Sequence, residues 1–250
     1  MGSRSHTSAM LAGLLTGVIC NSAQALVINE IRIDQTGSDN DEFFELAGQA
    51  HESLQGISYL VLGDASGDSS GVVESVTDLS GLQLDSRGLF LAAESSFSLG
   101  ATPSFFTNLN FENSDSVTHL LVRGFSGHRG DDLDDNGDGR LDTTPWIELL
   151  DSFAFVADSS SDSVYSPHRL NVSKPSHAYR TDFSTPQWQT GTWDTAQDTP
   201  NALNRGQAAW LTTGTPTIVS VPLPGTLSLL ALGLASLCRQ RWTRWRAARH

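Results

Sequence analysis

The chain has 250 residues and a formal net charge of −13 at pH 7, from 28 acidic and 15 basic side chains. All of the acidic residues lie between Glu30 and Asp198, and only nine basic residues lie between Arg32 and Arg205, so the part of the chain from Glu30 to Arg205 carries about −19. A surface of that charge repels phosphates and anionic lipid headgroups, which excludes nucleic acid as an expected partner.

The first 25 residues have the pattern of a secretory signal peptide. Arg4 provides a short basic start, residues 10–19 are an apolar run, and Ala23 and Ala25 have the spacing of a leader cleavage site. Cleavage after Ala25 would leave Leu26 as the new N-terminus. The alternative interpretation is an apolar core strand at the N-terminus.

Short apolar segments separated by Gly, Ser, Asp and Asn predict an all-β domain over residues 26–211, in the form of a β-sandwich or barrel. No amphipathic helix is evident in this range. Seven strands are expected, at 26–33, 43–46, 59–62, 72–76, 89–93, 117–122 and 147–156. The only two cysteines, Cys20 and Cys238, lie outside this range, so the domain is expected to use no disulfide.

The first expected strand alternates imperfectly between apolar and polar residues. Val27, Ile31 and Ile33 are predicted to share one face of this strand. Glu30 and Arg32 are predicted on the opposite face, although the two residues after Val27 break the phase.

A series of short motifs runs through the domain: VINEI at 27–31, DEFFEL at 41–46, LQG at 54–56, YLVLGD at 59–64, LSG at 79–81, GLFLA at 88–92, AYR at 178–180, Trp188 and TPNALN at 199–204. Their order resembles that of the lamin-tail domain family, with Asn201 where the family usually has glycine. The resemblance covers about residues 26–206. It implies an immunoglobulin-like β-sandwich, into which the acidic loop 131–142 would be an insertion.

Three glutamates lie on or beside the expected strands, where carboxylates are unfavoured. Of these, Glu42 and Glu45 are expected on opposite faces, because residues an odd number apart point to opposite sides of a strand. Together with Glu30 they leave two interpretations open. All three could be outward-facing and solvated, or one of them could cap a buried loop or help to bind a cation.

The acidic loop DDLDDNGDGRLD at 131–142 has the spacing of a calcium-binding loop. With Asp134 as the first position, oxygen ligands fall at one, three, five and nine, glycine falls at six, and position seven needs only its carbonyl oxygen. The expected metal ligands are therefore Asp134, Asn136, Asp138, Arg140 and Asp142, with Asp132 as a possible substitute for a missing ligand. Oxygen ligands of this kind favour Ca²⁺ over zinc.

The calcium pattern is incomplete at its end. The twelfth position is Pro145, where a bidentate glutamate normally completes the coordination shell, and Glu148 comes three residues too late. The alternative is a solvated acidic turn, because both Asn136-Gly137 and Asp138-Gly139 favour turns.

The C-terminal segment has the pattern of a membrane-spanning helix. Residues 219–238 contain no charge, and their number approaches the ~20 residues that cross a bilayer as a helix. Five arginines and no acidic residue follow, which predicts a cytoplasmic C-terminus. Residues 212–220 are expected to be a linker, and a buried core helix is the alternative to the membrane span.

The motif at the start of this segment, Val221, Pro222, Pro224 and Gly225, resembles the PEP-CTERM sorting signal of Gram-negative bacteria. Leu223 replaces the usual glutamate, and residues 221–250 contain the motif, the apolar helix and the basic tail in the family's order. The resemblance implies processing by an exosortase-type enzyme near residues 221–224, followed by release or surface attachment. A permanent membrane anchor is the alternative.

No catalytic pattern is evident. The seven histidines have no metalloprotease spacing, and the chain contains neither a nucleophile elbow nor a phosphate loop. The chain is therefore not expected to be an enzyme. The resemblance to lamin-tail domains and the sorting signals imply a structural or adhesive function at the cell surface or in the extracellular matrix, with extracellular polysaccharide or a surface protein as partner. The alternative is a secreted metal-dependent hydrolase, because lamin-tail domains accompany nucleases and phosphatases in bacteria.

Overall fold

The computed structural model describes residues 25–64, 70–109, 111–113, 115–157, 162–174 and 176–208. These residues lie in one compact unit, Ala23–Thr212. Ala23 of the predicted cleavage site, the linker 212–220 and the predicted sorting signal 221–250 lie outside the described residues. In the part of the chain that is described, no helix is long and apolar enough to span a membrane.

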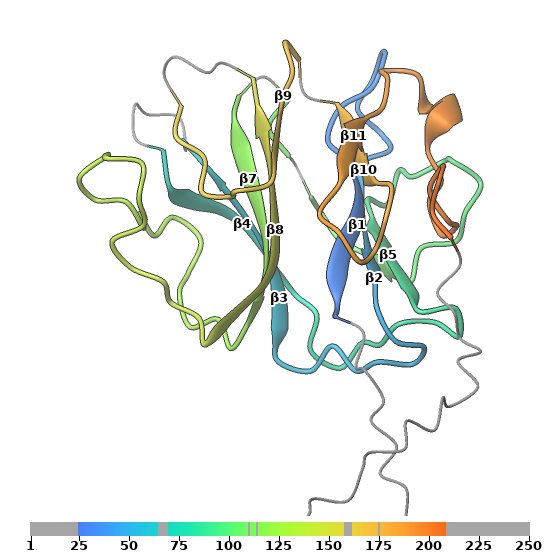
Figure 1. Ribbon diagram of the computed structural model, residues 1–250, viewed down its shortest axis with the longest axis horizontal. Coiled ribbons are helices and arrows are strands. Elements are labelled where there is room, and N and C mark those ends of the chain that lie inside the picture. Colours follow the sequence, from blue (N-terminus) through green and yellow to red (C-terminus); the bar gives the residue numbers. More distant parts are fainter. Residues whose placement is uncertain are drawn as a thin grey trace, which may run out of the picture. The chain divides into compact units, whose positions relative to one another are not determined.

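Two β-sheets form the domain (Figure 1). The first sheet has the order β11-β10-β1-β2-β5-β6 and contains β1 (Val27–Arg32), β2 (Phe43–Ala47), β5 (Leu89–Ala93), β6 (Phe105–Phe106), β10 (His177–Arg180) and β11 (Trp188–Thr190). The second has the order β4-β3-β7-β8-β9 and contains β3 (Ile57–Gly63), β4 (Val72–Asp78), β7 (Val117–Arg123), β8 (Glu148–Val156) and β9 (Arg169–Asn171). Neighbouring strands are antiparallel except for β5–β6 and β8–β9, which are parallel.

The predicted all-β class is confirmed. Each of the seven expected strands is present with bounds within a few residues of those predicted, and the 3₁₀ turn Thr195–Gln197 is the one helical element among the described residues. The two sheets pack face to face as a β-sandwich-like fold, because one apolar core contains side chains from both of them. At its centre, Phe44 of β2 stacks on Tyr59 of β3 with ring centroids 3.8 Å apart.

A β-bulge at Asn29 corrects the predicted faces of the first strand. The pairing of β1 with β2 shifts register between Ile28 and Glu30. As a result Ile28 lies in the central core with Ile31, whereas Val27 packs in a separate cluster on the other side of the sheet. The prediction that Val27 shares a face with Ile31 and Ile33 is therefore wrong, because one extra residue reverses the phase of the strand.

The outer face of the second sheet is covered by the chain between β7 and β8. A second apolar cluster on this face joins Leu60, Leu62 and Val122 of the strands to Leu133, with Leu141 and Trp146 packed against it. Leu133 and Trp146 belong to the connection that carries the acidic loop. The loop is thus attached to the domain by its own apolar side chains.

Candidate functional site

The first position of the predicted calcium loop lies inside the domain. Asp134 is 1% exposed. One of its oxygens accepts the backbone N–H of Asp138 at 3.1 Å, and the other accepts the N–H of Gly139 at 2.9 Å and the Tyr165 hydroxyl at 2.7 Å. Burial raises the pKa of Asp134, but the Tyr165 hydroxyl and these N–H groups outweigh burial and leave the pKa below its usual range. The carboxylate is therefore ionised at neutral pH.

The remaining loop side chains fold back on the loop's own backbone. The Asn136 amide donates to Asp142 at 3.2 Å, and its oxygen accepts the N–H of Asp138 at 2.9 Å. Asp138 in turn accepts the N–H of Arg140 at 3.0 Å, and Asp132 accepts that of Asp134 at 3.0 Å. Gly139, at the sixth position, has a φ of +81°, a conformation that favours glycine.

The predicted metal ligands do not converge as closely as two other groups in the domain. Among the described residues, two sets of three acidic or histidine side chains bring ligand atoms within 4.8 Å of one another, and neither set includes a residue of 131–142. One set is Glu30, His177 and Asp198, and the other is Asp64, Glu74 and Glu112. Calcium binding by the acidic loop stays a prediction.

The first set is a fully buried ion-pair network. Nε2 of His177 lies 2.7 Å from Glu30, and Nδ1 lies 3.3 Å from Asp198, an ion-pair contact without hydrogen-bond geometry. Arg32 holds both oxygens of Asp198. Glu30 also accepts the N–H and the hydroxyl of Thr199, each at 3.0 Å. The Arg32 guanidinium, which is bonded to both oxygens of Asp198, would repel a cation, so this set fits a metal ion poorly.

The network continues through neutral and acidic side chains. Asn29 donates to Glu45 at 2.7 Å, and Glu45 accepts the N–H of Asn201 at 2.5 Å. The Asn204 amide donates to the carbonyls of Asn29 at 3.0 Å and Arg180 at 3.1 Å. We call residues 29, 30, 32, 45, 177, 198, 199, 201 and 204 the polar clasp. It attaches the segment after the 3₁₀ turn to β1, β2 and β10.

These contacts decide between the two interpretations of the strand glutamates. Glu30, Glu42 and Glu45 are all buried, so the solvated interpretation is wrong. The loop-capping interpretation is confirmed, since Glu45 caps Asn201 and both oxygens of Glu42 accept the N–H of Phe111 at 3.1 Å. Burial, reinforced by the charge of Glu30, raises the pKa of Glu45 well above its usual range.

The second set forms an acidic group beside the β3–β4 connection. Burial, followed by the charges of Glu74 and Asp64, raises the pKa of Glu112 to about 7. Asp115 lies close enough to Asp64 for its own pKa to be raised, first by burial and then by that charge. Crowded carboxylates are common without a ligand, and the set supports no assignment by itself.

The sequence did not single out His177 or Asp198. The residues of the closing motif, 199–204, contributed to the family resemblance but not to any predicted site. Their partners on β1 are about 170 positions earlier in the chain, with Thr199 and Glu30 separated by 169 residues. The only signal for them was the presence of acidic side chains in apolar strand segments.

Comparisons with known proteins give no match. No protein-family model matches the chain, and neither the curated proteins nor the solved structures that were compared contain a significant match. The class of protein is defined by the structure alone: an all-β, β-sandwich-like domain with a buried polar clasp.

Proposed function

We propose that this protein is an exported β-sandwich module with a structural or adhesive role at the cell surface or in the extracellular matrix, and that its acidic loop binds Ca²⁺. The sandwich is of the immunoglobulin-like, lamin-tail type. Residues 1–25 direct export, and residues 221–250 are processed by an exosortase-type enzyme after residues 219–238 have held the chain in the inner membrane. Retention of that segment as a permanent anchor is the alternative that an intact mass of the exported protein tests.

The single observation that supports Ca²⁺ binding is the geometry of Asp134. Its buried, ionised carboxylate accepts the backbone N–H groups of Asp138 and Gly139, the fifth and sixth loop positions. The backbone of the loop therefore curves around the side chain at the first ligand position. Asp138 and Asp142 follow at the spacing of further oxygen ligands. Six aspartates within twelve residues repel one another, and a divalent cation would offset that repulsion.

The buried clasp favours a structural role over a catalytic one. His177 lies between two carboxylates, an arrangement that is useful in acid–base catalysis when a substrate can reach it. Here its side chain is fully buried and its neighbours bond the closing segment to β1. These ionisable groups thus hold the domain together.

Thermal unfolding of the purified chain tests the cation proposal. A cation that binds only the folded state stabilises it by about 2.7 kcal/mol at 100 times its Kd. For a domain of 150–250 residues this corresponds to a rise in Tm of about 5–11 °C. We expect a saturable rise with Ca²⁺ that EDTA reverses and that plain salt does not reproduce.

Matched variants assign the effect to the loop. Asp138→Ala/Asp142→Ala removes two exposed side chains at predicted ligand positions and should abolish the rise. Asp135→Ala removes an exposed loop charge at a non-ligand position and should preserve it. If both variants respond to Ca²⁺ like the unmodified protein, the loop is a solvated acidic turn.

A further inference from the structure

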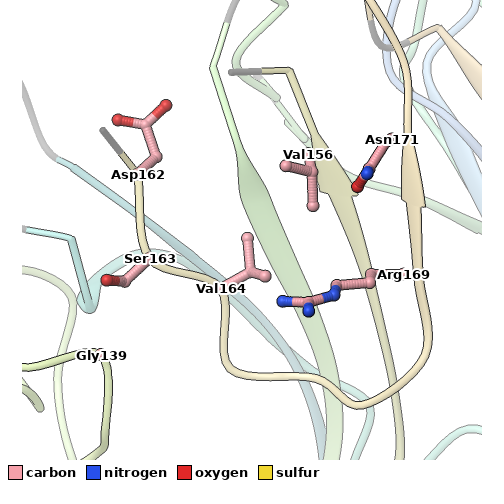
Figure 2. A pocket seen from close by; sticks show the side chains of 7 residues that line it. All are labelled: Gly139, Val156, Asp162, Ser163, Val164, Arg169 and Asn171. Atoms are coloured by element: carbon pink, nitrogen blue, oxygen red, sulfur yellow. The ribbon is translucent and has the colours of Figure 1, made fainter. Parts of the chain in front are cut away.

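A hollow of about 330 Å³ lies on the outer face of the second sheet, away from the polar clasp. Figure 2 shows Arg169 and Asn171 projecting from β9 on one side, Val156 at the end of β8 beside them, and the segment 162–164 on the other side. Gly139 of the acidic loop completes the lining. The volume is within the range of about 300–1,000 Å³ that is usual for small-ligand sites.

The strand pairing explains why these side chains meet. β9 pairs in parallel with β8, so that Asn171 lies beside Val156 and Arg169 beside Ala154. Between the two polar residues, Leu170 packs against the central core. Because side chains alternate along a strand, Arg169 and Asn171 both face outward.

The opposite wall is held in place by the rest of the domain. The backbone N–H of Tyr165 donates to the Thr118 hydroxyl at 3.0 Å, and the Tyr165 hydroxyl donates to Asp134. Ser163 donates its N–H to Ser70 at 3.0 Å and lies against Gly139. A wall fixed by such bonds lowers the entropy cost of ordering the site around a ligand.

The polar side chains around the hollow are not bonded to one another. Within the described residues, the guanidinium of Arg169, the amide of Asn171 and the carboxylate of Asp162 have no hydrogen-bond partner or ion pair. Several other arginines of the domain are ion-paired, as Arg180 is with Asp151 at 2.6 Å. The hollow therefore presents donors on one side and an acceptor on the other.

We propose that this hollow binds one sugar unit of a neutral polysaccharide. Sugar hydroxyls donate and accept hydrogen bonds, which suits the guanidinium and amide on β9 and the Asp162 carboxylate at the opposite rim. Val156 and Val164 offer apolar surface to the C–H groups of the ring. A neutral polymer is favoured over an acidic one because the part of the chain between Glu30 and Arg205 carries about −19, which repels polyanions. The inference rests on the proposed adhesive function and gives its ligand class.

Native affinity electrophoresis of the full chain in mild detergent tests the site. The gels contain dextran, galactomannan or mixed-linkage β-glucan as neutral probes, and polygalacturonate as an acidic probe. We expect at least one neutral polymer to retard the protein, with an apparent affinity at least tenfold weaker for Arg169→Ala/Asn171→Ala. Arg123→Ala, which changes another exposed arginine of the same sheet, should bind like the unmodified protein, and unchanged Tm values should show that all three proteins are folded.

Three outcomes would overturn the proposal: no retardation by any neutral polymer, equal retardation of the β9 double variant, or retardation by polygalacturonate alone. These experiments distinguish failure of the polysaccharide proposal from failure of the cation proposal. Loss of polysaccharide binding with an intact Ca²⁺-dependent rise in Tm overturns only the pocket. Polysaccharide binding without that rise supports the pocket and overturns only the calcium site.

Discussion

Replacing Arg32 by methionine should reveal how much the polar clasp contributes to stability. The side chains of Arg32 and Asp198 are 0% and 1% exposed, and Arg32 is bonded to both oxygens of Asp198. Removing one partner of a buried pair leaves an uncompensated charge and typically costs about 3–5 kcal/mol. At about 2–4 °C per kcal/mol for a domain of this size, the Tm should fall by about 6–20 °C.

Urea unfolding followed by tryptophan fluorescence measures this change, with an unchanged m-value as the check for two-state behaviour. The matched control is Arg123→Met, because the Arg123–Glu148 pair is 44% and 55% exposed and should contribute about 0–1 kcal/mol. Changing Asp198 to leucine in the Arg32→Met background should recover part of the loss, since the unpaired charge is then gone. A cost below about 1 kcal/mol for Arg32→Met would refute the clasp as a major stabilising element.

Three further predictions concern burial and packing. Burial raises the pKa of Glu42 from 4.5 to about 9, so between these pH values the folded state keeps a proton that the unfolded state loses. The free energy of unfolding should therefore fall as pH rises from about 4.5 to about 9. A pH series of urea midpoints should show this decline, and the Glu42→Gln variant should lack the part that Glu42 causes. Gly191→Ala should lower stability by about 1–3 kcal/mol in urea unfolding, because the added methyl group would overlap the buried His177 ring, and unchanged stability would contradict that packing. Leu133→Ala should cost about 2–5 kcal/mol by the same measurement, since Leu133 anchors the acidic loop to the second sheet, whereas the exposed Ile147→Ala should change stability by less than about 0.5 kcal/mol.

The strands that the sequence predicted are those with enough apolar residues to define a face. β3 and β7 each supply inward and outward apolar side chains, because both faces of the second sheet are covered. The short strands β6, β9, β10 and β11 were not predicted, since two to four residues carry too little periodicity to distinguish a strand from a loop. Their positions depend on pairing with distant strands, as β10 pairs with β1.

The functional residues could be predicted only where they are close together in the sequence. Loop spacing is a local property, so the turn at Gly139 and the position of Asp134 at the head of the loop could be predicted from neighbouring residues. The clasp could not, because Glu30, His177 and Asp198 meet only after the first sheet has formed. Acidic residues are usually exposed, so the sequence left a solvated position open for glutamates that the fold buries.

The position of the clasp gives the proposed surface attachment a mechanical consequence. The last described contacts before residue 209 are those of Asn204 with Asn29 and Arg180, and of Gln207 with the Asn29 side chain at 2.6 Å. If the protein is held through residues 221–250, a force applied to that attachment reaches these hydrogen bonds before it reaches the sheets. Asn29 is the bulged residue of β1, and its side chain also bonds Glu45 of β2. The bulge that disturbs the alternation of the first strand therefore places an amide where it can connect the closing segment to two central strands.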